Sequence, residues 1–343
     1  MLFLNGLNEL KVITQEQLIK FGLEAVWELQ QDETGCLAIF SPLFGRAEIK
    51  GGIPRFVKSA DNYSENFGFQ WKKFAKTQLD SYSGITLTSD RFFKDTQWSQ
   101  ADLKGRRVLE IGSGAGRFTE ILLLTGALVY SFDYSAAVEA NFANHGHHEN
   151  LLLFQGSVFE IPFPDDFFDF IFCFGVLQHT PDPPMALNCM VKKMKPEGKI
   201  AVDNYPAGSS IITKRPNSNY RKVARRLSFL SPKNLFQFVR FYHQFWFPID
   251  TLIRTKLPPT LYPKVLHHIG IPCFNYVHTI PLSYKQLKEW AILDTFDALG
   301  ATYDKPVTQE EFKALGEQAQ ILNFEVALAF NGFVLRGKGK RNK

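Results

Sequence analysis

The sequence predicts an α/β fold built on a doubly wound, mostly parallel sheet. From Leu103 onward, short apolar segments typical of strands alternate with helical segments at the spacing of such sheets. Within residues 108–120, an apolar strand runs directly into three glycines on alternate positions and then into a helix. Near the end of the chain, Asn331-Gly332 separates two strand-like segments, which indicates a closing antiparallel hairpin.

Each expected element follows from its local pattern. Apolar runs indicate strands at residues 107–111, 128–132, 151–154, 168–174 and 199–203. Helical patterns occupy 117–124, 135–144 and 184–194, and residues 195–198 are expected to turn into the fifth strand. Thr308 and Glu311 have the spacing of a capping box that opens a helix to about residue 320. Residues 324–330 and 333–336 are the expected hairpin strands.

Composition indicates an ordinary globular protein with one large domain and additions, or with two domains. The chain has 343 residues, 45% hydrophobic and 21% charged, which is enough for a full core. Its four cysteines are scattered without a C-x-x-C pair, which favours a reducing compartment and argues against structural zinc. No signal peptide and no apolar run of about 18 residues is recognisable, so we expect a cytoplasmic protein.

Charge is distributed unevenly along the chain. Residues 207–275 contain eleven Lys and Arg and a single acid, Asp250, so this segment carries +10. The whole chain carries only +5, and the remainder is therefore net negative. Such an asymmetry indicates a segment with a role of its own.

The glycine-rich segment is suited to a nucleotide-type ligand. Gly112, Gly114 and Gly116 let the chain turn tightly and approach a ligand that any Cβ would block. The following helix offers unpaired N–H groups at its first turn. Dinucleotide-binding loops place the third glycine one residue later, where this chain has Arg117. A different ligand is therefore expected, with Glu110 two residues before the first glycine.

This acid, followed by Gly-x-Gly-x-Gly after a strand, resembles motif I of the class I S-adenosylmethionine-dependent methyltransferases. The resemblance extends over roughly residues 63–337. It implies a Rossmann-like doubly wound sheet whose parallel strands are closed by an antiparallel hairpin. It also implies an enzyme that uses S-adenosyl-L-methionine and releases S-adenosyl-L-homocysteine, while nothing in the motif is specific for a substrate.

The expected cofactor-binding residues cluster at the carboxyl ends of the strands. Asp133 lies 21 residues after Gly112, where a carboxylate can accept both ribose hydroxyls; a turn or N-cap aspartate is the alternative. Glu110 is expected to order the ammonium end of the cofactor, or else to pair with Arg107. The family often has an acid for the adenine amino group where this chain has Ser157. The full expected set is Glu110, Gly112, Ser113, Gly114, Gly116, Asp133, Tyr134, Ser157, Val158, Phe174 and Gly175.

Methyl transfer from a sulfonium requires alignment, exclusion of water and, where needed, removal of a proton. His179 lies in a segment, 177–183, that resembles the one after the fourth strand in many small-molecule methyltransferases. It is a candidate general base, and the alternative is a structural histidine bonded to a backbone carbonyl. Asp203 is a comparable candidate at the end of the fifth strand. No metal is expected. We interpret His145, His147 and His148 as part of a solvated polar turn.

Two further regions resemble a group of bacterial methyltransferases. Upstream, residues 67–74 and 91–93 are expected to form helices that cover the cofactor. Downstream, residues 289–297 and 303–306 are expected to form an acidic loop that faces the substrate, or alternatively a capped loop that supports a lid. The substrate-binding candidates are Tyr205, Trp71, Asp294, Asp297 and Tyr303.

The basic segment, residues 205–282, interrupts the sheet pattern with prolines and two amphipathic helices. It is expected to lie over the active-site edge as a lid whose arginines neutralise a carboxylate or phosphate of a small molecule. Peripheral contact with a membrane surface and contact with nucleic acid are alternatives. Nucleic acid is disfavoured because the rest of the chain is net acidic. The simplest alternative is a helical pair whose apolar side is core.

The predicted organisation has four parts: an extension at 1–62, cofactor-covering helices at 63–102, a core at 103–204 and 283–337, and the lid at 205–282. Residues 52–57 resemble the end of a zinc-ribbon-like preface that has lost its metal, since only Cys36 precedes them. The predicted function is methylation of an oxygen or nitrogen atom of a small metabolite, such as a natural-product intermediate. A non-catalytic cofactor-binding or partner subunit, and a methyltransferase that reaches a lipid or macromolecule through the lid, are the alternatives.

Overall fold

The structure is a computed structural model. It describes residues 13–31, 33, 35–42, 44–57, 63–207, 220–258, 261 and 273–339. Several residues of the basic segment, Lys214, Arg215 and Lys264 among them, lie outside this part, as does the basic tail from residue 340 on.

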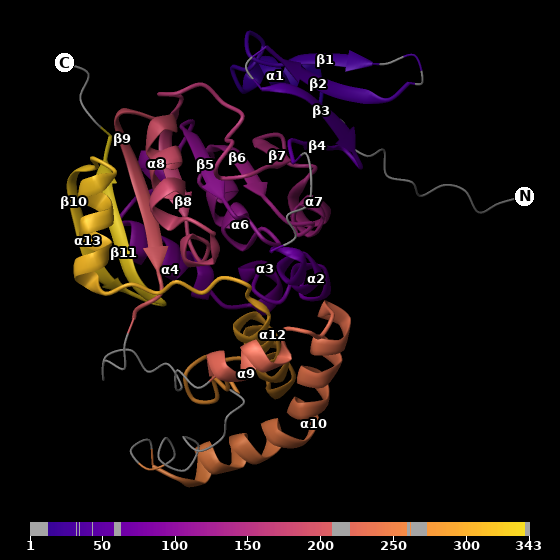
Figure 1. Cartoon of the computed structure of the whole chain (residues 1–343), viewed down its shortest axis with the longest axis vertical. Coiled ribbons are helices and arrows are strands. Elements are labelled where there is room, and N and C mark those ends of the chain that lie inside the picture. Colours follow the sequence, from indigo (N-terminus) through magenta and orange to yellow (C-terminus); the bar gives the residue numbers. More distant parts are fainter. Residues whose placement is uncertain are drawn as a thin grey trace, which may run out of the picture.

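A twisted sheet forms the centre of the molecule (Figure 1). Its parallel part has the order β7-β6-β5-β8-β9, and β11 and then β10 add to it antiparallel. The bounds are β5 Arg107–Ile111, β6 Leu128–Asp133, β7 Leu151–Gln155, β8 Phe168–Cys173, β9 Met194–Asn204, β10 Leu322–Ala329 and β11 Gly332–Lys338. The predicted five parallel strands closed by an antiparallel hairpin are confirmed.

Both faces of the parallel sheet are covered, which explains why its strands read as continuous apolar runs. Leu109 packs in one core with Leu187 of one helix and Phe312 of another. Its neighbour Val108 points to the opposite face, where it packs in a second core with Phe92 and Phe118. The helices that supply these residues are α4 Leu87–Thr96, α6 Arg117–Leu124, α8 Pro183–Lys193 and α13 Gln309–Gln318; α7 Val138–His145 and the 3₁₀ helix η1 Leu177–His179 complete the layers.

Three local expectations were wrong. Residues 195–198, expected as a turn, belong to β9, whose pairing with β8 shifts register between Phe168 and Phe170. The helix expected from residue 135 begins at Val138, because Ser135 is held by the Asp133 carboxylate at 2.8 and 2.7 Å. The hairpin turn is residues 330–331, since Ala329 pairs directly with Gly332.

The N-terminal extension contains α1 Gln15–Lys20 and a small antiparallel sheet. Its strands are β1 Glu28–Gln31, β2 Leu37–Ser41, β3 Gly45–Lys50 and β4 Ile53–Arg55. β4 joins the main sheet at β7, where Arg55 pairs with Gln155, so the two sheets are continuous. In the described part of the chain no three His, Cys, Asp or Glu side chains gather as a metal site. The resemblance to a zinc ribbon stays a prediction.

A helical body lies below the sheet in Figure 1. It consists of α2 Glu65–Lys73, α3 Asp80–Ser83, α9 Tyr220–Leu227, α10 Pro232–Lys256 and α12 Tyr284–Gly300, of which α2 and α3 adjoin the core. The short helix α5 Gln100–Leu103 lies elsewhere, where Asp102 pairs with Lys199 of β9. Residues 289–297, expected as a loop, are the middle of α12, which packs against α2, α9 and α10. No helix among the described residues is both long and apolar enough to span a membrane.

Candidate active site

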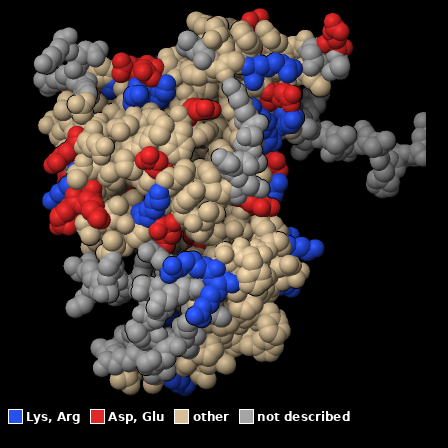
Figure 2. Space-filling model, viewed as in Figure 1, with Lys and Arg blue, Asp and Glu red and all other residues tan. Residues whose placement is uncertain are grey.

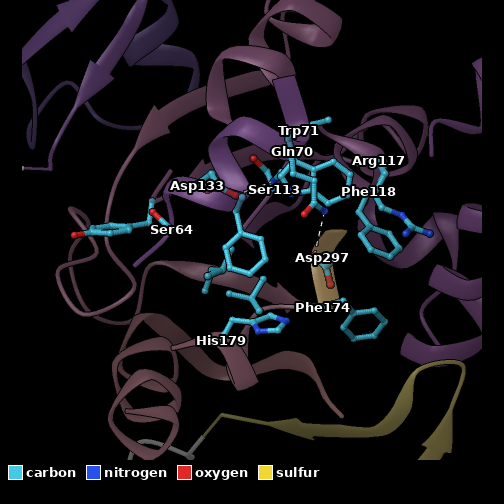
Figure 3. A pocket seen from close by; sticks show the side chains of 18 of the residues that line it. Ser64, Gln70, Trp71, Ser113, Arg117, Phe118, Asp133, Phe174, His179 and Asp297 are labelled. Carbon is cyan, nitrogen blue, oxygen red and sulfur yellow. Dashed lines mark hydrogen bonds between the residues drawn. The ribbon is translucent and has the colours of Figure 1, made fainter. Parts of the chain in front are cut away.

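A pocket opens where the carboxyl ends of the parallel strands meet the helical body. The hollow measures about 1140 Å³ with its opening to solvent included. Its walls come from the segments after β5, β6, β7, β8 and β9, and from α2, α4 and α12. Figure 3 shows side chains of these elements converging on one space. Ligands of doubly wound folds bind at this edge of the sheet.

The glycine-rich loop forms one wall with its backbone. Gly112, Gly114 and Gly116 all have positive φ values, of +72°, +54° and +90°. A Cβ on Gly112 would lie 2.2 Å from Val176, and one on Gly114 would lie 3.1 Å from the indole of Trp71. Only glycine is compatible with this conformation and these close contacts, so the loop forms a cradle that suits a nucleotide-type ligand.

Asp133 ends β6 at the floor of this cradle. Its Oδ2 accepts a hydrogen bond from the backbone nitrogen of Gly114 at 2.9 Å, and its Oδ1 accepts from the backbone and hydroxyl of Ser135. Burial raises the pKa of this carboxyl group, whereas the bonds from Ser135 and Gly114 act to lower it. Because the carboxylate lines the pocket and has remaining lone pairs, it can accept further hydroxyl groups.

Glu110 lies beneath the loop rather than in the wall of the pocket. It is buried, and its Oε2 accepts from the hydroxyls of Thr119 at 2.5 Å and Ser131 at 2.7 Å. Burial raises its pKa to about 7, although the two hydroxyl bonds lower it. The alternative pairing with Arg107 is not observed, because that guanidinium lies over the Phe167 ring at 4.4 Å.

Aromatic rings surround the Asp133 side of the pocket. Tyr134 stacks on Tyr63 at 5.0 Å between ring centroids, and Trp71 lies over the glycine-rich loop. Val158 also lines this side. Ser157, by contrast, is not part of the lining; its hydroxyl accepts from the backbone nitrogen of Phe159 at 3.2 Å.

His179 lines the pocket at the end of η1. Its Nδ1 lies 2.8 Å from the carbonyl oxygen of Tyr303, so Nδ1 carries the proton and Nε2 is left as an acceptor. The rings of Phe67 and Tyr205 lie 5.1 and 5.5 Å from the imidazole. The contact with the Tyr303 carbonyl agrees with the structural alternative, and the role of His179 as a general base stays a prediction.

Asp203 forms a buried ion pair instead of facing the pocket. Its Oδ2 lies 2.6 Å from Nη2 of Arg91, and its Oδ1 accepts from the backbone nitrogen of Gly175 at 2.5 Å. Burial raises the pKa of this carboxyl group, and Arg91 lowers it. Through these contacts Asp203 holds Arg91 and Gly175, which do line the pocket.

Arg117 was not predicted as a site residue, yet it is a partly buried cation in the pocket wall. Its Nη1 donates to Gln78 at 2.7 Å and its Nη2 to Thr88 at 3.3 Å, while Nε is buried without a partner. Among the described residues, no carboxylate forms an ion pair with it. Burial and the neighbouring Arg91 lower its pKa to about 9. In the sequence, its position directly after the third glycine of the loop could have marked Arg117 as a site residue.

Two acids of α12 reach the pocket from the opposite wall. Asp297 accepts from Nε2 of Gln70 at 3.1 Å, the bond drawn in Figure 3. Asp294 accepts from the hydroxyl of Tyr276 at 2.5 Å. One helical turn apart, both carboxylates face the same space.

The structure therefore brings most of the predicted residues together. Those that line the pocket are Gly112, Ser113, Gly114, Asp133, Tyr134, Val158, Phe174, Gly175, His179, Tyr205, Trp71, Asp294 and Asp297. Those outside its lining are Glu110, Gly116, Ser157, Asp203 and Tyr303. Lining residues that the sequence analysis did not select include Tyr63, Gln70, Arg91 and Arg117. No described arginine of α9 or α10 lines the pocket, contrary to what the lid interpretation expected.

The fold and the site resemble those of the class I S-adenosylmethionine-dependent methyltransferases, whose cofactor is S-adenosyl-L-methionine. Residues 109–202 match the family described as "Methyltransferase domain". The ubiquinone biosynthesis O-methyltransferase of Coxiella burnetii is 35% identical over 103 residues, which are 29% of this chain and 44% of that protein. The tRNA U34 carboxymethyltransferase of Sulfurimonas denitrificans is 32% identical over 126 residues, 36% of this chain and 43% of that protein. This chain thus spans less than half the length of these relatives.

Solved structures are similar at lower identity. A methyltransferase of Haloferax volcanii in complex with the activator Trm112 is 13% identical, with a TM-score of 0.45 over 83% of this chain and 100% of that chain. A SAM-dependent methyltransferase of Aquifex aeolicus is 14% identical, with a TM-score of 0.41 over 79% of this chain and 97% of that chain.

Proposed function

We propose that this protein transfers the methyl group of S-adenosylmethionine to an oxygen or nitrogen atom of a small metabolite with an acidic group, such as a natural-product intermediate, in the cytoplasm. One observation carries the proposal of an acidic substrate. Arg117, a partly buried cation whose Nε is buried without a hydrogen-bond partner, lines the same pocket as the glycine-rich loop. Figure 3 shows it on the opposite side of the pocket from Asp133.

The two sides of the pocket are proposed to bind different molecules, the cofactor on one side and the substrate on the other. The glycine-rich loop, Asp133 and the Tyr63–Tyr134 stack suit the nucleoside part of the cofactor. On the other side, Arg117 lies over the ring of Phe118 at 4.8 Å, so an aromatic or aliphatic acid can pair with its charge against an apolar wall. A substrate held between the two sides is aligned with the methyl group and shielded from water.

The cofactor supplies an activated methyl group on a sulfonium leaving group. In the proposed reaction the sulfur–methyl bond breaks, an oxygen–methyl or nitrogen–methyl bond forms, and the substrate loses one proton. Nε2 of His179 is the proposed acceptor of that proton, because Tyr303 holds the ring by its other nitrogen. Asp203 is proposed to act indirectly by positioning Arg91 and Gly175. The described part of residues 205–282, together with α12, is proposed to cover the pocket.

Transfer of labelled methyl groups tests the proposal. The protein is incubated with methyl-tritiated S-adenosylmethionine and a lysate of its host, and counts are separated into acid-precipitable and small-molecule pools. We expect counts in the small-molecule pool, with none above background for Gly114→Arg, whose side chain would fill the cradle. Counts in the precipitate would contradict a small substrate and indicate a protein or nucleic acid. No transfer would favour a non-catalytic cofactor-binding subunit.

The acidic group is tested separately with a matched pair of probes. Benzoate and benzamide differ in charge and little in shape. In the presence of S-adenosylhomocysteine, we expect the wild-type protein to bind benzoate at least about tenfold more tightly, because charge-assisted bonds contribute roughly 1.5–3 kcal/mol. Arg117→Met should abolish this preference without changing the affinity for S-adenosylhomocysteine. If it weakens S-adenosylhomocysteine instead, Arg117 binds the carboxylate of the cofactor and not the substrate.

A further inference from the structure

We propose that the outer face of α10 docks on an anionic lipid surface. This inference goes beyond the proposed reaction and does not depend on it. The docking face is defined by four apolar residues of α10, Phe241, Phe245, Ile249 and Leu252, together with the exposed cations of the same helix, Lys233, Arg240 and Lys256.

α10 is apolar on two faces, and only one of them belongs to the core. On its inner side, Val239 packs with Phe296 and Leu299 of α12, and Phe247 packs with Leu287. The four residues of the outer side are between 47% and 67% exposed. They recur at intervals of three and four residues, two before Pro248 and two after it, so each half of the helix carries a pair on one face. Large apolar side chains gathered on one exposed face mark a surface for a partner or a membrane.

The positive charge of the segment that contains α10 favours an anionic partner. In the described segment 220–258, Asp250 is the only acid, and it is buried in an ion pair with Arg254 at 2.6 Å. All exposed charges of that segment are therefore positive. Figure 2 shows Lys and Arg on the visible surface of the lower body, where α9 and α10 lie in Figure 1. An exposed apolar stripe beside cations is the pattern of helices that lie in the interface of an anionic bilayer.

A second copy of the chain fits this face less well. In a symmetric dimer the same patch meets itself, and because the exposed charges of this segment are all positive, neither copy would neutralise the cations of the other. Anionic headgroups neutralise these charges, while the acyl region takes up the phenylalanines. Since α12 both packs on α10 and lines the pocket, docking would place the pocket one helix away from the bilayer.

Co-sedimentation with vesicles tests the proposal. The probes are vesicles of phosphatidylcholine alone and of phosphatidylcholine with about 30 mol% phosphatidylglycerol. We expect the full chain to bind the anionic vesicles at about 0.05 M salt and to dissociate at about 0.5 M, because salt screens the charge attraction. Phe241→Ser with Phe245→Ser should lower the partition constant at least about tenfold. Lys233→Gln with Arg240→Gln should lower it less and flatten the salt dependence.

Leu124→Ser is the matched control, since Leu124 is 72% exposed on α6 and outside the docking face. It should leave vesicle binding unchanged. All variants are expected to keep the wild-type affinity for S-adenosylhomocysteine, because no docking-face residue lines the pocket. The proposal is overturned if the wild-type chain does not sediment with anionic vesicles at low salt, or if the Phe241/Phe245 variant still binds them. It is equally overturned if that variant converts a dimer into a monomer.

Discussion

The backbone nitrogen of Gly114 donates a hydrogen bond to the carboxylate of Asp133 at 2.9 Å, across the ends of two neighbouring strands. Asp133 therefore has two roles. Asp133 fixes the turn of the glycine-rich loop, and it presents its remaining acceptor capacity to the pocket. The loop and the acid are 19 residues apart in the chain, and the parallel pairing of β5 with β6 brings them together.

Asp133→Ala should weaken the binding of S-adenosylhomocysteine about tenfold or more, because it removes charge-assisted bonds of roughly 1.5–3 kcal/mol. Calorimetric titration measures this change. Ser135→Ala is the control, because it removes one support of the carboxylate at 2.7 Å and keeps the charge. Unchanged binding by Asp133→Ala would remove this residue from the cofactor site.

Substitution of Gly116 should destabilise the fold more than substitution of Gly84. Both glycines have positive φ values, +90° and +77°. An alanine Cβ at Gly116 would also lie 2.3 Å from Asn141, whereas nothing lies within 4 Å of the same atom at Gly84. We expect Gly84→Ala to cost about 1–2 kcal/mol from backbone strain and Gly116→Ala about 1–3 kcal/mol more from the clash. Denaturant unfolding of the two variants gives the comparison, and equal losses would contradict the predicted crowding.

Glu110 should make the protein less stable as the pH rises. Its pKa is raised from 4.5 to about 7, mainly by burial. Below pH 4.5 both folded and unfolded chains hold the proton. Between pH 4.5 and 7 the folded chain keeps a proton that the unfolded chain has released, so the free energy of unfolding falls through this window, by about 3 kcal/mol in total.

The side chain of Glu110→Gln cannot titrate, so the free energy of unfolding of this variant should lack the pH dependence that Glu110 causes. The difference in unfolding free energy between wild type and Glu110→Gln, followed from pH 4 to about pH 8 without cofactor, isolates the effect from other groups. The wild-type protein should become less stable relative to the variant as the pH rises. A difference that is constant across this range would show that Glu110 is ionised throughout.

Arg91→Met should be strongly destabilising. The substitution leaves the carboxylate of Asp203 buried without the cation that lies 2.6 Å away, and breaking such a pair typically costs about 3–5 kcal/mol. Asp203→Asn in the same chain removes the uncompensated charge, so the double variant should regain part of the loss. Thermal or denaturant unfolding of the two single variants and the double variant completes the cycle. Additive effects would show that the two residues are not coupled.

His179→Asn separates the catalytic role from the structural one. The asparagine amide can still donate to the carbonyl of Tyr303, as Nδ1 does at 2.8 Å, but it offers no equivalent of Nε2. If Nε2 accepts the substrate proton, kcat should fall about 10²–10⁴-fold, and affinity for S-adenosylhomocysteine should stay the same. His179→Ala, which loses both functions, is the comparison. Full activity of His179→Asn combined with a defect of His179→Ala would assign the residue a structural role alone.

Local patterns were sufficient wherever an element is defined by its own periodicity. β5 and α6 have the predicted bounds, because a buried parallel strand is apolar throughout and an N-terminal glycine turn leads directly into the helix. The capping box at Thr308 is confirmed, with both of its hydrogen bonds present. These features depend on residues a few positions apart.

α12 shows where local patterns were insufficient. Its N-terminus has a capping box at Ser283 and Gln286 that could have revealed a helix. Its apolar residues, however, face α2 on one side and α9 and α10 on the other, so no single hydrophobic stripe marks it. Arg117 illustrates the same limit at the site. Its guanidinium is held by Gln78 and Thr88, which lie 39 and 29 residues away along the chain.

The sequence by itself determined the doubly wound sheet, its closing hairpin, the glycine-rich loop and somewhat less than half of the residues that line the pocket. The strands follow from short-range patterning, and the edge at which ligands bind follows from the doubly wound fold class. The order of the strands in the sheet came from the structure. Tertiary structure alone decided which charges are neutralised. Asp203 meets Arg91 across 112 residues, while the partly buried Arg117 has no ion pair in the described part of the chain. The balance between desolvation and pairing depends on distances in space, and spacing along the chain does not encode those distances.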